Sequence, residues 1–409
     1  MTLDIKDLIE AVSGKAAAIR RVTRLEALGE KIFPPTFEGG IYADEPRLVR
    51  DDESVKEMPT VLLDSVASQA NRIQTALLRA YREKKIAMPM VQVDFAGSGE
   101  NAILQEIGVL TTLEAPHRIF DAIFRDSLQD GKPFREGPLG TQLTSSRASN
   151  ATALLGSCPD ALFGGFWDST GPRGGLGAKL QRALVSEIVG YQSVAGKRTA
   201  SRIDPLQIEN NVEIYAKVGG GWTFEEQEAQ RNKSGKPITK RPSEINHGNI
   251  VPSLTHEDKE TRKQLLNHGG VTIAYAQQHT LLSLAALRRL RFPIQGGTAS
   301  NEIDLAGRVL VAALALAGIC FLDDEGYDLR SRCLLDGQPG TFEVVGQGTN
   351  KPFSLSSTEA AALLTEAARR AIELGLPWSE QPVTLQPSAK LIRLVTESRT
   401  RSMSKQIEE

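Results

Sequence analysis

The stretch that decides the fold reads TVLLDSVASQANRIQTALLRAYREKK over Thr60–Lys85. Its apolar residues recur at spacings of three and four, the period of one buried helix stripe. They are Leu62, Val66, Ala70, Ile73, Leu77 and Tyr81. We therefore predict a long helix over this stretch. Its polar side carries amides, hydroxyls and one arginine, whereas a solvated helix face usually carries Lys and Glu.

Further elements are predicted on both sides of this helix. The second half of Lys15–Gly29 and the segment Met90–Phe95 alternate apolar and polar residues, a pattern typical of half-buried strands. Pro116 is expected to open a second helix. A buried helix is predicted from Asn301 to Ala317, with Gly318 placed to end it.

The C-terminal part contains one strong helix signal. Ser356 and Glu359 form a capping-box pattern, and the helix that follows is expected to stop at Gly375. After Pro387 the chain is polar, and we expect it to fray. Strands and helices alternate irregularly, with strand pairs close together, so the sequence favours an α+β core over a doubly wound parallel sheet.

The overall composition is that of an ordinary globular protein. The 409 residues include 48 Lys and Arg against 50 Asp and Glu, and 40% are hydrophobic. Disorder, collagen and coiled coil are therefore excluded as descriptions of the whole chain. The slightly acidic average does not favour a nucleic-acid partner, so any such function must depend on where the cations are placed.

Compartment and cofactor signals are few. The longest apolar run, Val309–Phe321, is shorter than the ~20 residues of a membrane helix, and the N-terminus has no secretory pattern. Cys158, Cys320 and Cys333 form no C-x-x-C pattern, which fits a reducing cytoplasm and argues against zinc. We expect a cytoplasmic protein with no membrane partner, metal or cofactor.

A glycine-rich loop reads WDSTGPRGGLGAK over Trp167–Lys179. Its four glycines allow a close approach to an anion, and Arg173 and Lys179 add positive charge. The spacing fits neither a P-loop nor a dinucleotide loop. The sequence therefore predicts a cradle for a phosphate backbone, with an ordinary flexible hairpin as the alternative.

Other cations are clustered. Arg198 and Arg202 would share one face of a strand, because side chains alternate along strands. A second group crowds the end of a helix, where cations also complement the helix dipole. It consists of Arg288, Arg289 and Arg291. Catalytic patterns are weak: the histidines show no metal-binding spacing, and no G-x-S-x-G motif occurs.

Four segments in order resemble a known family. They are Leu62–Arg72, Phe166–Gly190, Arg198–Pro205 and Ser283–Pro293, and Arg24–Thr36 agrees as well. Over most of Arg20 to Pro293 the chain resembles the Cas-seven family of the RAMP superfamily. This family forms the backbone subunit of the CRISPR surveillance complex, Cascade, here in the subtype I-G, formerly I-U.

The resemblance implies an α+β fold with an RNA-recognition-motif (ferredoxin-like) palm and large inserted thumb and finger segments. Residues 15–216 would form the first part of the palm with inserted helices, 217–260 a thumb- or finger-like excursion, 261–380 the rest of the palm with C-terminal helices, and 387–409 a polar tail. The aromatic signature of ordinary RNA-recognition motifs is absent, so base stacking on the sheet is not expected.

The resemblance also implies a function in antiviral defence. Such subunits polymerise head-to-tail as a helical filament along a CRISPR RNA and present its bases to target DNA, without catalysis. Their other partners are a large subunit and a repeat-processing or handle-binding subunit. Because base pairing reads the target, the protein needs only contacts to backbone and shape.

The predicted RNA contacts come from the polar helix face, the glycine-rich loop and the clustered cations. They are Lys31, Gln69, Asn71, Arg72, Arg173, Lys179, Arg182, Arg198, Arg202, Arg288, Arg289 and Arg291. Trp222 is a candidate wedge between bases, or else an anchor for its loop. Two rival functions remain: a ribonuclease that uses Asp168 or Asp204, and an oligomeric scaffold without nucleic acid.

Overall fold

The computed structural model describes residues 2–51, 54–171, 178–198, 200–257, 264–266, 268–294, 300–346 and 350–408. The chain divides into two compact units. The first comprises Met1–Phe37, Tyr42–Ser193 and Ile273–Ile392, and the second Glu38–Ile41, Val194–Thr272 and Arg393–Glu409. Helices and strands are both abundant, and the paired strands among the described residues are antiparallel apart from β4 (Val91–Asp94) with β25 (Val383–Pro387), which is consistent with the predicted α+β class.

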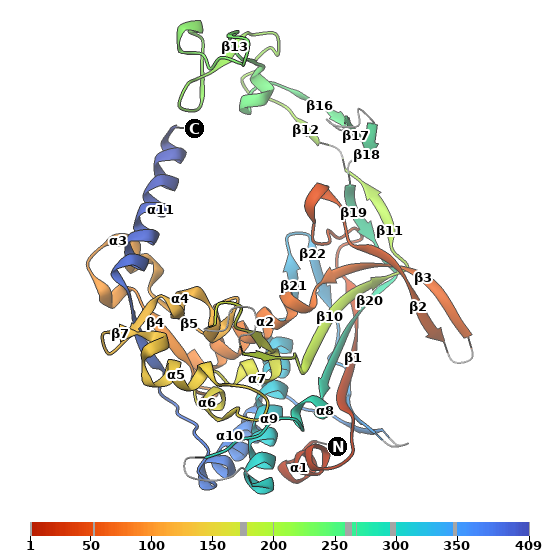
Figure 1. Ribbon diagram of the computed structural model, residues 1–409. Coiled ribbons are helices and arrows are strands. Elements are labelled where there is room, and N and C mark those ends of the chain that lie inside the picture. The colour runs from red at the N-terminus through yellow and green to blue at the C-terminus, as the bar shows by residue number, and fades with distance from the viewer. Residues whose placement is uncertain are drawn as a thin grey trace. The chain divides into compact units, whose positions relative to one another are not determined.

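The first unit is built on a nine-stranded antiparallel sheet (Figure 1). Four strands lie side by side in its centre, in the order β3 (Ser54–Asp64), β10 (Leu184–Tyr191), β20 (Tyr275–Ser283) and β1 (Ala18–Ala27). At one edge β2 (Asp44–Asp51) pairs with β3. On the other side β1 pairs with both β22 (Cys333–Asp336) and β23 (Phe342–Val345). The remaining strands are β21 (Tyr327–Arg330), which pairs with β22, and β24 (Lys351–Phe353), which pairs with β23.

Strand β1 confirms the predicted alternation. Ile19, Arg21, Thr23 and Leu25 are buried, whereas the residues between them are exposed. The buried face packs on helices, so one side of the sheet forms the core and the other stays open.

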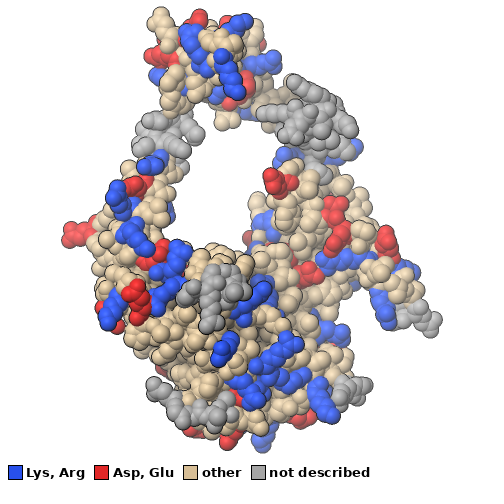
Figure 2. Space-filling model, in the orientation of Figure 1, with Lys and Arg blue, Asp and Glu red and all other residues tan. Residues whose placement is uncertain are grey.

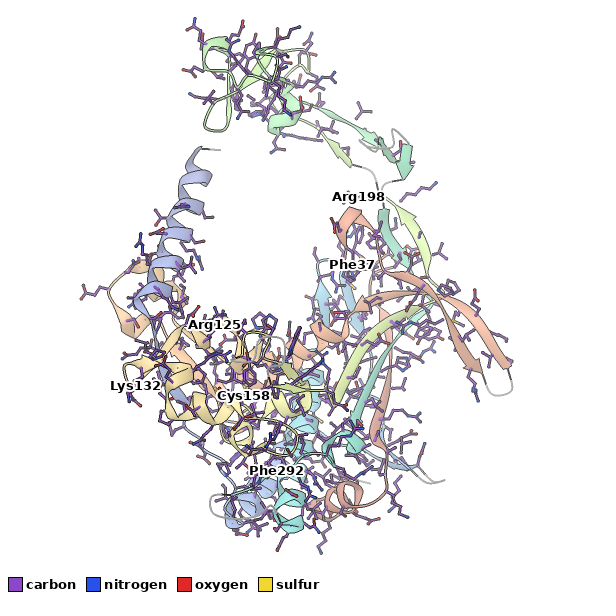
Figure 3. The ribbon with its side chains drawn as sticks, viewed as in Figure 1. Phe37, Arg125, Lys132, Cys158, Arg198 and Phe292 are labelled. Atoms are coloured by element: carbon purple, nitrogen blue, oxygen red, sulfur yellow. The ribbon has the colours of Figure 1, made fainter. Side chains whose placement is uncertain are left out.

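The main helices beside this sheet come from distant parts of the chain. They are α2 (Val66–Arg82), α9 (Asn301–Glu325) and α10 (Ser357–Glu373); α2 and α10 both pack against α9. Smaller helices of the unit are α1 (Ile5–Ser13), α3 (Ala102–Ile107), α4 (Ala122–Arg125), α5 (Pro138–Thr144), α6 (Thr152–Leu155), α7 (Asp160–Gly164) and α8 (Leu284–Leu287). The side chain of Phe292, labelled in Figure 3, is fully buried in this unit.

The predicted start of the long helix at Thr60 is wrong. Residues 60–64 are the end of β3, which pairs with β10 there, and the helix begins after Ser65. The Ser65 hydroxyl accepts a hydrogen bond from the Ser68 backbone N–H as the N-cap. The apolar run Val61–Leu63 fits a buried strand as well as a helix, so periodicity alone could not separate the two.

The predicted end of the buried helix at Ala317 is also wrong, because α9 continues through Gly318 to Glu325. A Cβ atom at Gly318 would lie 2.7 Å from Cγ2 of Ile73 in α2. Gly318 therefore allows two helices to approach closely and does not end one. Among the described residues, α9 alone is long and apolar enough to span a membrane, and most of its apolar stretch is buried inside the fold.

This contact gives a prediction about stability. Replacing Gly318 by valine should lower the free energy of unfolding by about 1–3 kcal/mol, because the new side chain overpacks the α2–α9 contact. Urea unfolding measures the effect. The exposed helix position Thr365 is the control, and Thr365→Val should change stability by less than about 0.5 kcal/mol. Equal stability of the two variants would show that the helices do not pack closely here.

A second, five-stranded sheet contains the predicted strand at Met90–Phe95. In order it consists of β5 (Val109–Thr111), β4 (Val91–Asp94), β25 (Val383–Pro387), β6 (Ser127–Gln129) and β7 (Lys132–Pro133). The helix predicted after Pro116 is wrong: a short 3-10 turn, the short helix α4 and strand β6 take its place. Arg118, with a φ of 53°, interrupts any continuous helix.

The C-terminal helix signal is confirmed, and the prediction for the tail is wrong. The Ser356 hydroxyl accepts from the Glu359 N–H, and the Glu359 carboxylate accepts from the Ser356 N–H, at the start of α10. After Pro387, where fraying was expected, the chain forms α11 (Ala389–Glu408). Side-chain spacing at four residues allows the Arg393–Glu397 ion pair along it.

The second unit consists of short antiparallel strands. Two-stranded ribbons are β11 (Val194–Lys197) with β19 (His268–Thr272), β12 (Ala200–Arg202) with β16 (Ile250–Ser253), and β17 (Thr255–Glu257) with β18 (Gln264–Leu266). A three-stranded sheet contains β13 (Ile214–Ala216), β14 (Trp222–Thr223), β15 (Thr239–Lys240). The excursion predicted at 217–260 lies inside this unit.

Candidate nucleic-acid interface

The start of α2 is organised by one buried carboxylate. Asp64, at the end of β3, is fully buried and accepts hydrogen bonds from Gln69 Nε2 at 2.6 Å and Arg72 Nε at 2.9 Å. Arg330 Nη2 lies 3.4 Å from the other carboxylate oxygen. Two cations and one amide therefore satisfy a charge that would be costly to bury alone.

Gln69 is not available for the RNA contact predicted for it. Its side chain is buried, and its Oε1 accepts from Ser186 Oγ and Gln278 Nε2, both at 2.9 Å. The amide links α2 to strands β10 and β20. The helical pattern alone suggested an exposed polar face, but this residue lies on the side covered by the sheet.

Arg72 and Asn71 lie at the surface to different degrees. Arg72 is partly exposed, and its Nη2 donates to the Leu329 carbonyl at 2.6 Å, which attaches α2 to the β21–β22 hairpin. Asn71 is exposed on the same helix. Arg72 is thus largely committed to structure, whereas Asn71 presents its amide to solvent.

The loop that carries Lys31 meets the same hairpin. The Phe33 backbone N–H donates to the Arg332 carbonyl at 3.1 Å, and the Arg332 guanidinium lies 4.2 Å from the centre of the Phe33 ring. Lys31 is partly exposed, two residues away. We call the surface made by Lys31, Asn71, Arg72, Arg330 and Arg332 the α2–hairpin surface.

Sequence reasoning missed Arg330 and Arg332. They flank Ser331 in the tight turn between β21 and β22, and Arg332 has a φ of 62° there. Two short alternating segments around Arg-Ser-Arg were a usable hairpin signal. Their closeness to α2 could not be predicted from the sequence, because Arg330 lies 266 residues after Asp64 in the chain.

The glycine-rich loop is described only at its ends. Arg173 and residues 172–177 lie outside the described residues, so the phosphate cradle stays a prediction. Lys179 is exposed in β9 (Lys179–Leu180), which pairs with β8 (Phe166–Trp167), and its ammonium lies 5.7 Å from the centre of the Trp167 ring. Trp167 is 54% exposed, so the stem of the loop presents a cation and an aromatic ring together.

Arg182 is held inside the fold. Its guanidinium donates to the carbonyls of Gly164 at 3.2 Å and Val66 at 3.0 Å. Burial lowers the pKa of Arg182, and the nearby Arg118 lowers it further. These contacts make Arg182 a link between the start of α2 and the segment before β8, which leaves little of it for RNA.

The cations after α8 differ among themselves. Arg288 donates to the carbonyls of Gly14 and Ala16, Arg289 donates to Gln181 Oε1 at 2.9 Å, and Arg291 pairs with the buried Asp304 at 2.5 Å. Arg289 and Arg291 remain exposed. The predicted cluster therefore offers two accessible cations, and Arg288 mainly binds backbone oxygens.

The structure adds one cation to this group. The Arg291 backbone N–H donates to the Ala148 carbonyl, so the turn that contains the exposed Arg147 lies next to Arg291. In Figure 2, Lys and Arg side chains gather on this face of the first unit, over α6 and α8. We call Arg147, Arg289 and Arg291 the α8 cluster. It is a second positive surface on the same unit.

The second unit carries the remaining predicted contacts. Arg198, labelled in Figure 3, is exposed after the end of β11, and Arg202 is partly exposed in β12, 3.8 Å from Asp204. These strands pair with different partners, β19 and β16. The prediction that one strand holds both Arg198 and Arg202 is therefore wrong.

Trp222 begins β14 and is 40% exposed. Its ring contacts the 60% exposed Phe224 edge to face, with centroids 5.2 Å apart. This exposed aromatic pair suits stacking as well as anchoring, so the base wedge stays a prediction.

The two candidate catalytic aspartates are both engaged in structure. Asp168 is buried and binds Arg135 through both oxygens, at 2.9 and 2.7 Å. Asp204 is also buried and accepts from the backbone N–H groups of Leu206, Ile208 and Gly248. Burial raises the pKa of Asp204, but these donors outweigh burial and lower the pKa below its usual value.

Potential metal ligands do not come together in the part of the chain that the structure describes. Within the described ranges, no group of three His, Cys, Asp or Glu side chains is placed to hold a metal ion. The three cysteines are buried and unpaired, and burial raises the pKa values of their thiols. A buried thiol with a raised pKa is a poor nucleophile.

Comparison with known proteins adds one finding. A family model described as CRISPR-associated protein GSU0053 matches residues 21–194. The match covers most of β1 and all of α2 and β10; it includes Lys31, Asn71 and Arg72 of the α2–hairpin surface but not the β21–β22 hairpin. No curated protein matches the chain.

Proposed function

We propose, from the match of residues 21–194 to the family model described as CRISPR-associated protein GSU0053, that the chain is a non-catalytic backbone subunit that binds CRISPR RNA. Several copies would line the RNA head-to-tail and support target DNA recognition. In this proposal the other partners are the large subunit and the handle-binding subunit of a type I-G Cascade in the cytoplasm.

Strand order supports a palm of the RNA-recognition-motif type. Along the chain the central elements follow as β1, α2, β10, β20, α9 and β23, and across the sheet the strands lie as β23, β1, β20 and β10. The β-α-β-β-α-β sequence of elements is that of ferredoxin-like folds. In this interpretation β2 and β3 are an addition at the edge.

The observation that carries the proposal is the α2–hairpin surface. The loop of Lys31, helix α2 and the β21–β22 hairpin bring amide and cationic groups to one place. The loop and α2 lie within the residues that match the family, and the hairpin is hydrogen-bonded to both. Guanidinium and amide donors suit phosphate and sugar oxygens, and such contacts carry no sequence information. A subunit that leaves the bases to pair needs this kind of contact.

The glycine-rich loop gives one test of RNA binding. Replacing Arg173 and Lys179 by alanine should weaken retention of guide RNA about tenfold or more, since two phosphate contacts would be lost. RNA affinity measured by fluorescence anisotropy across several salt concentrations checks this. The salt slope should fall by about 1.4 for two single-strand contacts. Unchanged affinity and slope would remove the cradle from the proposal.

The ribonuclease alternative has its own test. The buried pairing of Asp168 with Arg135 and the backbone donors to Asp204 leave neither carboxylate placed to activate water. The purified complex should leave a labelled complementary RNA intact in the presence of magnesium. Cleavage that Asp168→Asn or Asp204→Asn abolishes, with RNA binding retained, would favour the enzyme.

A scaffold without nucleic acid is the remaining alternative. The ratio of absorbance at 260 nm to that at 280 nm of the purified complex separates it from the proposal, because bound RNA raises this ratio. A protein-like ratio in complexes made together with their guide RNA would favour the scaffold.

A further inference from the structure

The stem of the glycine-rich loop, formed by β8 and β9, holds one aromatic ring out in solvent. In this ladder Trp167 lies opposite Lys179. Neighbouring residues of a strand point to opposite faces, and Phe166 is the one that turns inward: it is buried and stacks on Phe120 with ring centroids 4.7 Å apart. Trp167 therefore points outward, and more than half of it is exposed.

Contacts on both sides of Trp167 fix its backbone. Before it, the Gly165 carbonyl accepts a hydrogen bond from Arg118 Nη1 at 2.9 Å. After it, the buried Asp168 carboxylate binds Arg135 through both oxygens. The ring is thus presented by a rigid support, and a ligand that covers it needs to order little of the protein.

Two cations lie beside this ring. The Lys179 ammonium is 5.7 Å from the centre of the Trp167 ring. Gln181 follows two residues after Lys179, and its Oε1 accepts from Arg289 Nη1 at 2.9 Å, so the exposed guanidinium of Arg289 lies close to the stem. Within the part of the chain that the structure describes, no carboxylate pairs with Lys179 or Arg289. Both charges therefore remain available to an anion.

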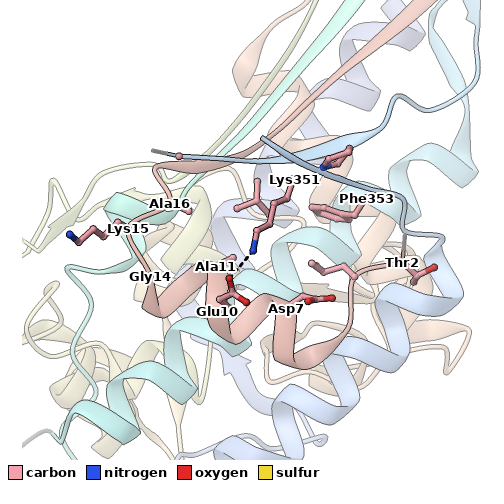
Figure 4. A pocket seen from close by; sticks show the side chains of 13 residues that line it. Thr2, Asp7, Glu10, Ala11, Gly14, Lys15, Ala16, Lys351 and Phe353 are labelled. Carbon is pink, nitrogen blue, oxygen red and sulfur yellow. Dashed lines mark hydrogen bonds and ion pairs between the residues drawn. The ribbon is translucent and has the colours of Figure 1, made fainter. Parts of the chain in front are cut away.

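An apolar pocket of about 480 Å³ beside α1 in the same unit lacks this combination (Figure 4). Asp7 and Glu10 line it together with Lys15 and Lys351, and the Lys351 ammonium binds Glu10 at 2.7 Å. Its aromatic lining residue, Phe353, is buried. The pocket thus offers a nucleotide neither an excess of positive charge nor an open ring.

An exposed ring beside two unpaired cations suits a single nucleic-acid strand. Such strands are bound by aromatic side chains that stack on bases and by cations that contact phosphates. We propose that Trp167 stacks on a base of the bound RNA, while Lys179 and Arg289 contact neighbouring phosphates. Stacking covers the face of a base and leaves its pairing edge open, so the contact is compatible with presentation of the guide. It also requires no particular base, because every base has a π-face.

The inference rests on the proposed function, since it names a contact that the same RNA makes. Replacing Trp167 by alanine should weaken RNA affinity about tenfold, because one stacked base is lost. The dependence of affinity on salt should stay unchanged, because stacking releases no counterion, whereas Lys179→Gln should lower the salt slope by about 0.7. Trp167→Phe keeps a ring and should retain most of the affinity.

Fluorescence anisotropy of a short, labelled single-stranded RNA with the full-length chain, at several salt concentrations, measures these effects. Unchanged affinity in Trp167→Ala overturns the proposal. So does a loss that comes with the slope change of Lys179→Gln, since Trp167 would then only position the lysine.

Ile372→Ala is the control for removing an exposed apolar side chain. Ile372 is 50% exposed on α10, an element outside the stem. Its replacement should leave RNA affinity unchanged. A loss as large as that of Trp167→Ala would overturn a specific contact at Trp167.

Tryptophan fluorescence tests stacking without reference to affinity. Besides Trp167, the chain contains Trp222 and the buried Trp378. In the variant Trp222→Phe, saturating RNA should quench part of the emission, because a base stacked on the Trp167 indole quenches it. Adding Trp167→Phe should abolish this quenching. Quenching that survives in the double variant would contradict the proposal.

The failure of this inference differs from the failure of the proposed function. A wild-type chain that binds RNA no better than Trp167→Ala overturns the stacking contact alone. A wild-type chain that binds no RNA, by itself or with its partner subunits, overturns the proposed function and this inference with it.

Discussion

Reversing the charges of Lys31 and Arg332 together is expected to weaken binding of guide RNA roughly a hundredfold. A hydrogen bond to a charged group contributes about 1.5 kcal/mol or more, and two lost phosphate contacts therefore correspond to about two factors of ten. The variant Lys31→Glu with Arg332→Glu reverses one cation of the loop and one of the hairpin turn, and it leaves Arg330 beside Asp64. Because the Arg332 guanidinium also contacts the Phe33 ring, circular dichroism and urea unfolding of the variant check that the fold is retained.

The control has to match the change in net charge. Lys84 and Lys132 are both exposed in the first unit, away from the α2–hairpin surface, and Lys132 is labelled in Figure 3. Lys84→Glu with Lys132→Glu should reduce affinity only through the weak, salt-screened field of the whole protein. Equal losses in the two double variants at moderate salt would mean that net charge, and not this surface, holds the RNA.

Replacing Arg21 by alanine is expected to lower the free energy of unfolding of the first unit by about 3–5 kcal/mol. Arg21 is 1% exposed in β1 and binds both carboxylate oxygens of Asp323 in α9, at 2.5 and 2.7 Å. Its guanidinium also lies 4.7 Å from the centre of the Phe342 ring. Burial lowers the pKa of Arg21, but Asp323 more than compensates and raises it.

The large cost arises because alanine would leave the Asp323 charge buried without a cation. Replacing both partners by apolar residues, Arg21→Met with Asp323→Leu, should recover most of the loss, since a buried ion pair contributes little net stability against a well-packed apolar pair. Urea unfolding of the three proteins measures both effects. A loss below about 1 kcal/mol in Arg21→Ala would show that β1 and α9 are not joined by this pair.

Elements with strict local patterns could be predicted from the sequence. The alternation in β1 and β4 and the capping box of α10 depend on neighbouring residues, and the structure confirms them. The residues at which helices and strands begin and end were predicted less accurately. The end of β3 and the continuation of α9 past Gly318 depend on which distant element packs there, and an apolar run does not contain that information.

The candidate site was predicted only in part for the same reason. Asn71 follows from the helix pattern, but the burial of Gln69 depends on Ser186 and Gln278 from two other strands. Arg332 comes near the loop of Lys31 because its carbonyl accepts a hydrogen bond from the Phe33 N–H, about 300 residues away in the chain. Residue type alone cannot separate an arginine that binds a carbonyl, such as Arg182, from one that faces solvent, such as Arg289.

Ultraviolet crosslinking of the native complex, followed by mass spectrometry, shows directly whether the α2–hairpin surface holds the RNA. RNA-linked peptides are expected from residues 29–37, 65–75 and 328–334. Peptides confined to other segments, or complexes that carry no RNA when made together with their guide, would contradict this expectation.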